Sequence, residues 1–308
     1  MNLILHIGTA KTGSSSIQTF LFENKIQLNK FGYEYIHTEG RVDNRDIAVA
    51  FMKRSKSDEY TKSYKIEGEI IRFEFSEHFK KKLTDKILSL KDQGIHTCVI
   101  SSEHLSSRIN KTDELDSFKL YLQEIFDDIR IIAYVRDQRK KFPSSYSTRI
   151  KSGGTLTFNK AFNDYFNSSN DFYHAYFQLW GDFFGQESIR LQLFDRKHLL
   201  NGDLLQDFLI LSGIEIDHKE LKDLRSELNT SLSKNACNIL RIMNLFLPKS
   251  NLKSTKIRGL LIKVLNYLPG KPWTLSPEQS ELLKQKYQTS NEALRKHYFP
   301  SKQSLFDD

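Results

Sequence analysis

A loop rich in glycine and serine follows the first apolar run of the chain and is the clearest candidate for chemistry. It occupies positions 8–16 and opens a stretch with helical spacing. Unpaired amides at the start of a helix point outward at the positive end of its dipole, and glycine lets the backbone approach an anion closely. The pattern therefore indicates phosphate binding, with a plain turn and a serine N-cap as the alternative. The candidate ligand-binding residues of the loop are Lys11, Thr12, Gly13, Ser14, Ser15 and Ser16.

This loop differs from the Walker A sequence G-x-x-x-x-G-K-[ST] of ATP-binding proteins. Gly8 and Gly13 have the required spacing, but Ser14 stands where the lysine belongs and the lysine lies at position 11. The chain also lacks a convincing apolar strand that ends in an aspartate suited to magnesium, since Ile100 leads into Ser-Ser-Glu. The sequence therefore disfavours an ordinary Mg-ATP site.

A second anion-binding pattern follows the apolar run 129–135. Arg136 comes directly after this run, Ser144 stands eight residues later, and Tyr146 completes an S-x-Y pattern. An arginine at the end of a strand can fork onto a phosphate, and a serine on the next helix can add another donor. Together they would bracket one dianion. The alternative is that Arg136 pairs with Asp137 or a neighbouring acid and that Ser144 caps a helix after Pro143.

Two titratable residues, Glu103 and His104, follow the apolar run 95–100. Ligands of an open α/β sheet bind beyond the carboxyl ends of the strands, so both could face the crevice that holds Lys11 and Arg136. Either could act as a general base. Adjacent residues at a strand end point in opposite directions, and we expect Glu103 rather than His104 to reach the acceptor. A glutamate that only caps the following helix is the alternative.

Four short apolar runs of strand length must position these residues, and longer stretches with helical spacing lie between them. The runs are 3–7, 95–100, 129–135 and 189–194, and helical spacing is clearest around residues 17–21, 79–88 and 204–209. Alternation of this kind predicts an α/β fold with a central parallel sheet flanked by helices in three layers. We expect a single domain, with an α/β core over 1–200 and a mainly helical part over 201–308. In this reading 41–79 is an irregular or helical excursion near the acceptor, and Pro277 opens a helix that runs to about His297.

The motif Lys11-Thr12-Gly13-Ser14-Ser15 resembles the 5′-phosphosulfate loop of the PAPS-dependent sulfotransferases, where PAPS is 3′-phosphoadenosine 5′-phosphosulfate. The likeness is clearest over 3–21 and 99–146 and weaker over 193–196, 229–233 and 275–299. The resemblance implies that Lys11 holds the bridging oxygen as the S–O bond breaks and that residues 12–15 hold the phosphosulfate. It also implies that Arg136 and Ser144 bind the 3′-phosphate, that Tyr146 belongs to the same motif, and that Glu103 or His104 is the base.

The resemblance further implies a P-loop-like fold, release of 3′,5′-adenosine bisphosphate and no metal. The bacterial members that this chain looks like act on carbohydrate, as cell-surface polysaccharide or lipopolysaccharide. We therefore expect a carbohydrate or glycolipid acceptor and no nucleic acid. A Mg-dependent P-loop kinase or nucleotide hydrolase, and a non-catalytic module that binds polyanions, are the alternatives.

Composition bounds the partners and the compartment. The net charge of +8 favours anionic ligands, and two cysteines are too few for a disulfide scaffold. The first residues form too short an apolar run for a signal peptide, so we expect a cytoplasmic protein, with the inner face of the membrane as one location. Residues 255–268 place apolar side chains on one helical face, which predicts a helix packed on the core or, as the alternative, a basic amphipathic helix on an anionic membrane.

Overall fold

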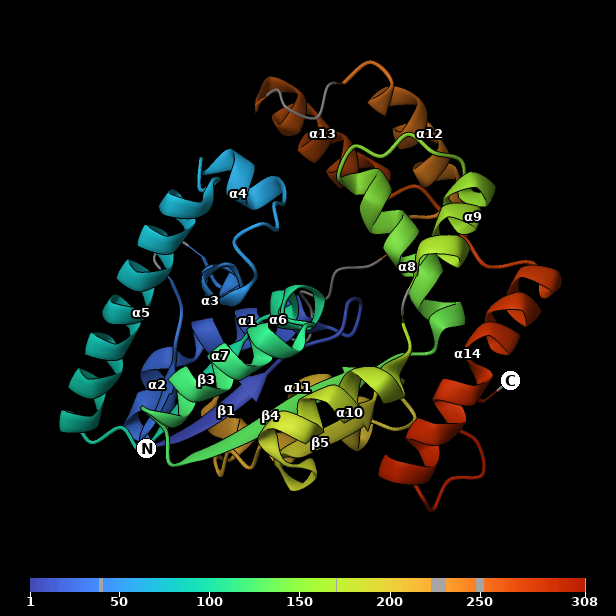
Figure 1. The fold of residues 1–308 in the computed structure, drawn as a ribbon. Coiled ribbons are helices and arrows are strands. Elements are labelled where there is room, and N and C mark those ends of the chain that lie inside the picture. The colour runs from blue at the N-terminus through green and yellow to red at the C-terminus, as the bar shows by residue number, and fades with distance from the viewer. Residues whose placement is uncertain (39–40, 170, 223–230, 248–251, 308) are drawn as a thin grey trace. The chain divides into compact units, whose positions relative to one another are not determined.

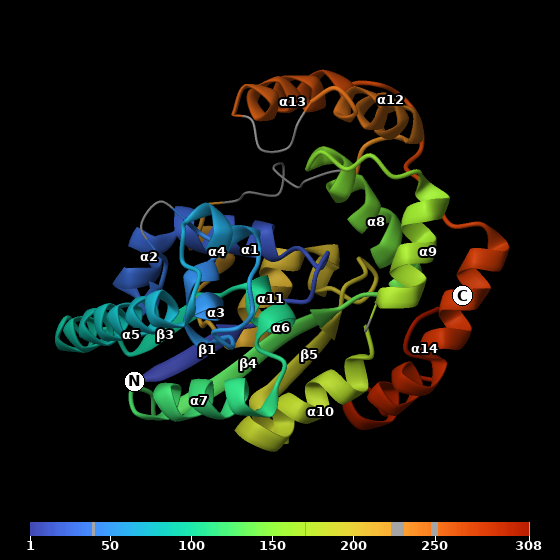
Figure 2. The same cartoon turned by 45° about the horizontal axis from the view of Figure 1, so that its top comes forward.

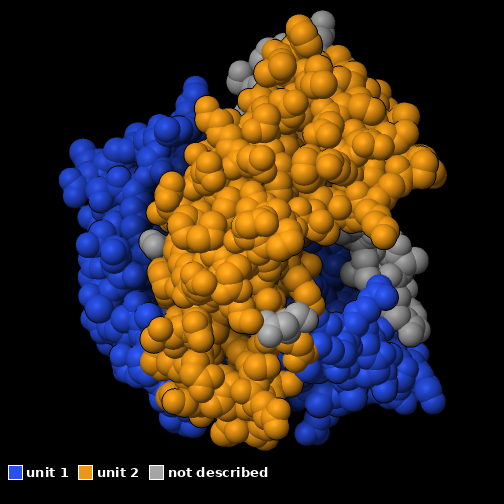
Figure 3. Space-filling view, turned by 90° about the vertical axis from the view of Figure 1, so that its right-hand side faces the viewer, with its two compact units in different colours: residues 1–135, 175–228 blue, residues 136–174, 229–308 orange. Residues whose placement is uncertain are grey.

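A computed structural model of the 308-residue chain describes residues 1–38, 41–169, 171–222, 231–247 and 252–307 (Figure 1). The chain divides into two compact units, coloured separately in Figure 3. Unit 1 comprises residues 1–135 and 175–228, and unit 2 comprises residues 136–174 and 229–308. These borders differ from the division at residue 200 expected from the sequence, and the single-domain organisation stays a prediction.

Unit 1 is built on a sheet of five parallel strands in the order β2-β3-β1-β4-β5. The predicted α/β class is confirmed, and each of the four apolar runs forms a strand. The central strands are apolar almost throughout because both of their faces are buried. The strands are β1 (Asn2–His6), β2 (Tyr33–Tyr35), β3 (Thr97–Ser101), β4 (Asp128–Val135) and β5 (Ile189–Leu193).

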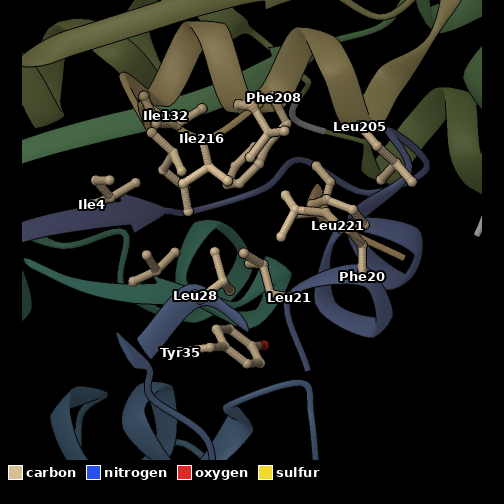
Figure 4. Close-up of a cluster of buried hydrophobic side chains, with 14 of the residues drawn as sticks. Ile4, Phe20, Leu21, Leu28, Tyr35, Ile132, Leu205, Phe208, Ile216 and Leu221 are labelled. Carbon is tan, nitrogen blue, oxygen red and sulfur yellow. The ribbon is translucent and has the colours of Figure 1, made fainter. Parts of the chain in front are cut away.

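Helices cover both faces of this sheet. On one face α1 (Ser14–Glu23), α2 (Lys25–Lys30) and α11 (Leu204–Ser212) contribute to an apolar cluster with the sheet residues Ile4 and Ile132, as Figure 4 shows. Figure 1 shows α7 (Thr112–Gln123) and α10 (Tyr173–Phe184) in front of the sheet. Buried rings of these two helices, Phe118 and Trp180, meet edge to face. The remaining helices of unit 1 are α3 (Arg45–Phe51), α4 (Glu59–Ser63), α5 (Glu69–Asp92) and α6 (Glu103–Arg108), with short 3-10 turns at Gln186–Ser188, Leu200–Gly202 and His218–Glu220.

The predicted excursion 41–79 is largely helical, since it contains α3, α4 and the first part of α5. Its first residues are held at the carboxyl end of β3 by hydrogen bonds from Asn44. The buried side-chain amide of Asn44 donates to the carbonyls of Ile36 (2.7 Å) and Ser101 (3.3 Å). The excursion is therefore anchored beside α6, which starts two residues after β3.

Unit 2 is helical in its described residues and has an aromatic core of its own. The ring of Phe158 stacks on that of Trp273 with centroids 4.4 Å apart, and Phe142 and Tyr146 contact Phe158 from α8. The predicted C-terminal helix is confirmed, and Ser276 starts it with a capping box. The helices are α8 (Gln138–Lys151), α9 (Phe158–Ser168), α12 (Lys234–Asn244), α13 (Leu252–Leu265) and α14 (Pro277–Tyr298).

The predicted helix at 255–268 is α13, but its apolar residues do not share one environment. Leu265 is buried, and Leu261 and Ile262 pack against the core of unit 2. Ile257, Leu260, Val264 and Leu268, expected on the same face, are exposed. The expectation that all of them pack together is corrected, because the helix turns a neighbouring face toward the core. Of the described helices, none is both long and apolar enough to cross a membrane.

Candidate active site

The predicted phosphate loop lies between the carboxyl end of β1 and the start of α1, as expected. Two contacts fasten it to the neighbouring strand β4: the amide of Ile7 donates to the carbonyl of Ile132 (3.1 Å), and the hydroxyl of Thr9 donates to the carbonyl of Tyr134 (2.7 Å). The buried Thr12 hydroxyl donates to the Thr9 carbonyl (2.6 Å). The proton of Thr12 is therefore used inside the loop, where it fixes the loop conformation.

The loop has three residues with left-handed backbone conformation, at Gly8 (φ 54°), Lys11 (φ 69°) and Gly13 (φ 80°). A Cβ atom on Gly13 would lie 2.3 Å from Cδ2 of Leu204, and one on Gly8 would lie 2.8 Å from the hydroxyl oxygen of Ser14. Both glycines are thus required by backbone conformation and by space. Lys11 takes the same unfavourable conformation with a side chain, a strain often found at functional sites.

The N-terminus of α1 offers hydrogen-bond donors to an anion. Its N-cap is Gly13, which supplies no side-chain oxygen, and the amides of Ser16 and Ile17 both return to the Gly13 carbonyl. The alternative of a serine N-cap is therefore wrong. The hydroxyl of Ser14 is buried and has no hydrogen-bond partner among the described residues. A buried hydroxyl at the positive end of a helix fits an acceptor oxygen of a phosphate or sulfate group.

Glu103 lies next to this loop. It is the first residue of α6, and its Cα and Cβ atoms are 3.0 and 3.1 Å from the position that a Cβ on Gly8 would take. The amide of Gln18 on α1 donates to Oε2 of Glu103 (2.7 Å) and fixes the carboxylate. Sequence reasoning missed Gln18, although it lies one helical turn after Ser14 and both side chains are buried.

His104, the other candidate base, is held in a network of charged side chains. Its Nδ1 is 2.8 Å from Nη1 of Arg108, and its Nε2 is 3.5 Å from Oδ2 of Asp43. An arginine can only donate, so Nδ1 accepts and the proton is on Nε2. Burial opposes ionisation of Asp43, yet hydrogen bonds from His104 and Arg41 hold the pKa of Asp43 below its usual value. Both imidazole nitrogens are therefore engaged.

The strand end that precedes the loop carries a buried histidine. His6 is fully buried, its Nδ1 lies 2.7 Å from the Ser101 hydroxyl, and its Nε2 has no partner among the described residues. Burial lowers the pKa of His6 to about 3. The imidazole is therefore neutral near pH 7 and adds no charge beneath the loop.

The second predicted motif lies in unit 2. Arg136 directly follows β4, and its carbonyl accepts a hydrogen bond from the Tyr173 hydroxyl (2.8 Å). Ser144 stands inside α8, whose N-cap is Asp137, so the alternative that Ser144 caps a helix is wrong. Pro143 also lies within this helix. The prediction that the serine follows on the next helix is thus confirmed, and its role stays a prediction.

Tyr146 differs from the other predicted ligand-binding residues. Its side chain is buried in the aromatic core of unit 2, and its hydroxyl donates to the carbonyl of Leu156 (3.1 Å). With its only polar atom satisfied within the core, Tyr146 packs and positions α8. We correct the expected ligand contact accordingly and leave Tyr146 out of the functional proposal.

Unit 2 also has a hollow of about 630 Å³ between the start of α8 and α14. Its wall carries charges of both signs that pair locally: Arg139 with Asp137 (2.8 Å) and Lys296 with Glu292 (3.8 Å). Such a wall has little excess positive charge for a dianion, unlike the helix start beside Gly13.

Comparison with known proteins gives limited similarity. No family model matches the chain. An uncharacterized protein of Archaeoglobus fulgidus is 28% identical over 208 residues, which are 66% of this chain and 54% of that protein. The chain thus spans about half the length of this curated relative. Among solved structures, the crystal structure of a sulfotransferase from Alicyclobacillus acidocaldarius matches 86% of this chain and 95% of its own, with a TM-score of 0.47 and 13% identity.

Proposed function

We propose that this chain is a sulfotransferase that moves a sulfuryl group from PAPS to a hydroxyl or amine of a carbohydrate acceptor. The acceptor class comes from the sequence resemblance, which favours a cell-surface polysaccharide or a lipopolysaccharide. The proposal includes a cytoplasmic location, no metal and no nucleic-acid partner.

The observation that carries the proposal is a carboxylate beside an anion cradle. The cradle combines the uncapped start of α1, the buried Ser14 hydroxyl and the two left-handed glycines, and Glu103 packs against Gly8. An anion site alone would suit any nucleotide. A fixed carboxylate next to it suits transfer from a bound anion to an acceptor that must lose a proton.

In the proposed reaction the residues of the loop act on the donor. The amides at the start of α1 and the Ser14 hydroxyl hold the phosphosulfate, and Lys11 neutralises the negative charge that develops on the oxygen bridging phosphorus and sulfur. In-line placement and neutralisation of this kind need no metal, as the analogy with phosphoryl transfer indicates.

Glu103 acts on the acceptor. The acceptor O–H or N–H bond breaks and its proton passes to Oε1 of Glu103, while Gln18 holds Oε2. The acceptor atom forms a bond to sulfur as the bond between sulfur and the bridging oxygen breaks, and the nucleotide leaves as 3′,5′-adenosine bisphosphate. We favour Glu103 over His104 because a base must offer a lone pair, and Nδ1 of His104 already accepts from Arg108.

Recognition of the 3′-phosphate is proposed for Arg136 and Ser144. The proposal rests on their spacing and on connectivity, since Arg136 is the first residue after β4 and β4 pairs with β1, which leads into the loop. A guanidinium can bind a phosphate dianion with two parallel hydrogen bonds.

A thermal-shift assay tests the donor. 3′,5′-Adenosine bisphosphate without metal should raise the melting temperature of the full chain, because a ligand that binds only the folded state stabilises it by mass action. Arg136→Ala should weaken this shift, and Lys140→Ala, in the same helix as Ser144, is the control. Stabilisation by Mg-ATP and none by 3′,5′-adenosine bisphosphate would instead indicate a kinase or nucleotide hydrolase. Transfer of labelled sulfate to a panel of glycans then identifies the acceptor.

A further inference from the structure

The net charge of the chain is concentrated in one stretch of unit 2. Residues 228–277 contain eight lysines and arginines and no aspartate or glutamate. The remainder of the chain is electrically balanced, since the net charge of all 308 residues is also +8. The stretch includes α12 and α13, which lie side by side in Figures 1 and 2. We call α12, α13 and the described turn residues 245–247 and 266–268 the basic hairpin.

The basic hairpin also exposes an unusual amount of apolar surface. Nine of the 21 exposed large apolar side chains among the described residues lie between positions 239 and 268, which is about a tenth of the chain. Phe246 is 79% exposed, and Leu260 and Val264 are 64% and 69% exposed. Single exposed apolar residues are common, but a cluster of this kind marks a binding surface.

The exposed residues form stripes along both helices. In α12, Ile239 and Ile242 are spaced three apart and share one face, and the exposed Phe246 lies in the turn that follows the helix. In α13, Ile257, Leu260 and Val264 likewise share one face. Lys256 and Lys263 are exposed at the border of the α13 stripe. Apolar stripes bordered by lysine are typical of helices that lie in a membrane interface.

Internal contacts hold the basic hairpin in shape. The buried Arg258 on α13 donates to Oδ1 of Asn244 (3.0 Å) and to the carbonyl of Leu247 (2.9 Å) at the end of α12. The amide of Asn244 donates in turn to the carbonyls of Ile150 (2.8 Å) and Gly154 (2.9 Å). The stripes are therefore presented by packed helices whose other faces belong to the core of unit 2.

We propose that the basic hairpin binds the surface of a membrane that contains anionic lipid. The apolar stripes enter the boundary between headgroups and acyl chains, and the lysines at their border contact headgroup phosphates. The absence of acidic residues over 228–277 complements a negative surface. A folded protein partner or a second copy of the chain would satisfy the apolar stripes but would leave this charge excess unexplained.

Co-sedimentation of the full chain with vesicles tests the proposal without any need for turnover. The chain should bind vesicles of phosphatidylcholine and phosphatidylglycerol, bind pure phosphatidylcholine weakly, and lose binding as salt is raised. The double variant Leu260→Ser, Val264→Ser should lower the affinity by about tenfold or more. The double variant Lys256→Gln, Lys263→Gln should lower it by roughly tenfold. All four side chains are exposed, so thermal unfolding should change little.

Ile70→Ser is the matched control, because Ile70 is 75% exposed on α5 outside the basic hairpin, and it should bind vesicles like the unchanged chain. The proposal fails if the chain does not bind anionic vesicles. It also fails if the lysine variant binds less while the leucine and valine variant binds normally, since the surface would then serve a soluble polyanion. A dimer in light scattering that Leu260→Ser, Val264→Ser dissociates would assign the stripes to a second copy.

Discussion

The loop at residues 8–16 and the basic hairpin both suit anions, but they are built on opposite principles. The loop contains one charged residue, Lys11, and depends on fixed amides, a buried hydroxyl and two glycines that admit no side chain. The basic hairpin depends on an excess of lysine and arginine and on exposed apolar stripes. The loop is thus suited to one group in one geometry, whereas the hairpin is suited to an extended surface.

Net charge is therefore a poor guide to where a small anionic ligand binds. The net charge of +8 favours anionic ligands in general. Residues 228–277 alone have a net charge of +8, so the rest of the chain has a net charge of zero. The candidate loop lies in unit 1, which has 26 lysines and arginines and 30 aspartates and glutamates and therefore no excess of positive charge. Substitutions that alter geometry should therefore disable the loop, while the hairpin should respond to charge, apolar area and salt.

The largest expected effect separates the two candidate bases beside the loop. Glu103→Gln should lower turnover by about 10²- to 10⁴-fold, since the amide cannot take the acceptor proton. His104→Ala should lower it far less, because both imidazole nitrogens are engaged in the network with Asp43 and Arg108. The check is the rate of sulfate transfer at saturating donor. An equal loss in the two variants would contradict the assignment of the base.

Lys11→Ala should have the next largest effect. We expect a loss of turnover of about 10²- to 10³-fold, because charge on the leaving oxygen is no longer neutralised. Lys65→Ala is the matched control, because Lys65 also has a left-handed backbone (φ 55°) and is exposed. The control should keep full activity. Comparable losses would show that the lysine acts through general charge, which would remove the contrast with the hairpin.

A glycine pair tests geometry in the two regions directly. Gly13→Ala should lower the free energy of unfolding by ~3 kcal/mol, through backbone strain and a contact of 2.3 Å with Leu204. Gly259→Ala, inside α13 with no atom near its added Cβ, should raise that free energy by ~1 kcal/mol. Denaturant titration measures both. A tolerated Gly13→Ala would mean that the loop is not the rigid cradle described above.

The smallest expected effect at neutral pH is that of His6, because this residue affects the stability of unit 1 only in acid. The pKa of His6 is about 3 in the folded chain and near 6.5 when unfolded, so the unfolded state binds the extra proton between these values. Stability from His6 is therefore complete above pH 6.5 and falls by about 1.4 kcal/mol per pH unit as the pH drops toward 3. His6→Asn should flatten this dependence in denaturant titrations. An identical slope in the variant would show that His6 is not held neutral.

Much of the fold could be predicted because strands that are buried on both faces appear in the sequence as continuous apolar runs of strand length. The runs at 3–7, 95–100, 129–135 and 189–194 each gave a strand within a few residues. The strand β2 (Tyr33–Tyr35) was missed, since three residues are too few to show a period. The helices α3 and α4 were hidden for a similar reason: both are short and carry polar residues.

The candidate site was less predictable because its contacts join distant parts of the chain. Lys11 and Glu103 could be identified from the spacing of the motifs. The contacts of Gln18 with Glu103 and of Asp43 with His104 depend on the folded chain and have no local sequence pattern. The motif also includes Tyr146, because sequence spacing carries no information on burial. Which face of α8 meets the core depends on α9 and on Trp273, and no local pattern contains that information.

At Lys11, the residue type that suits the left-handed backbone best differs from the residue type that the proposed transfer needs. A glycine there would relax a conformation that costs an ordinary residue about 1 kcal/mol, and the molecule would become sturdier. The same exchange would remove the amine that we propose acts in the transfer step. Selection of variant libraries for thermal stability alone should therefore enrich Lys11→Gly. The enriched variants should be well folded and should lack transfer activity.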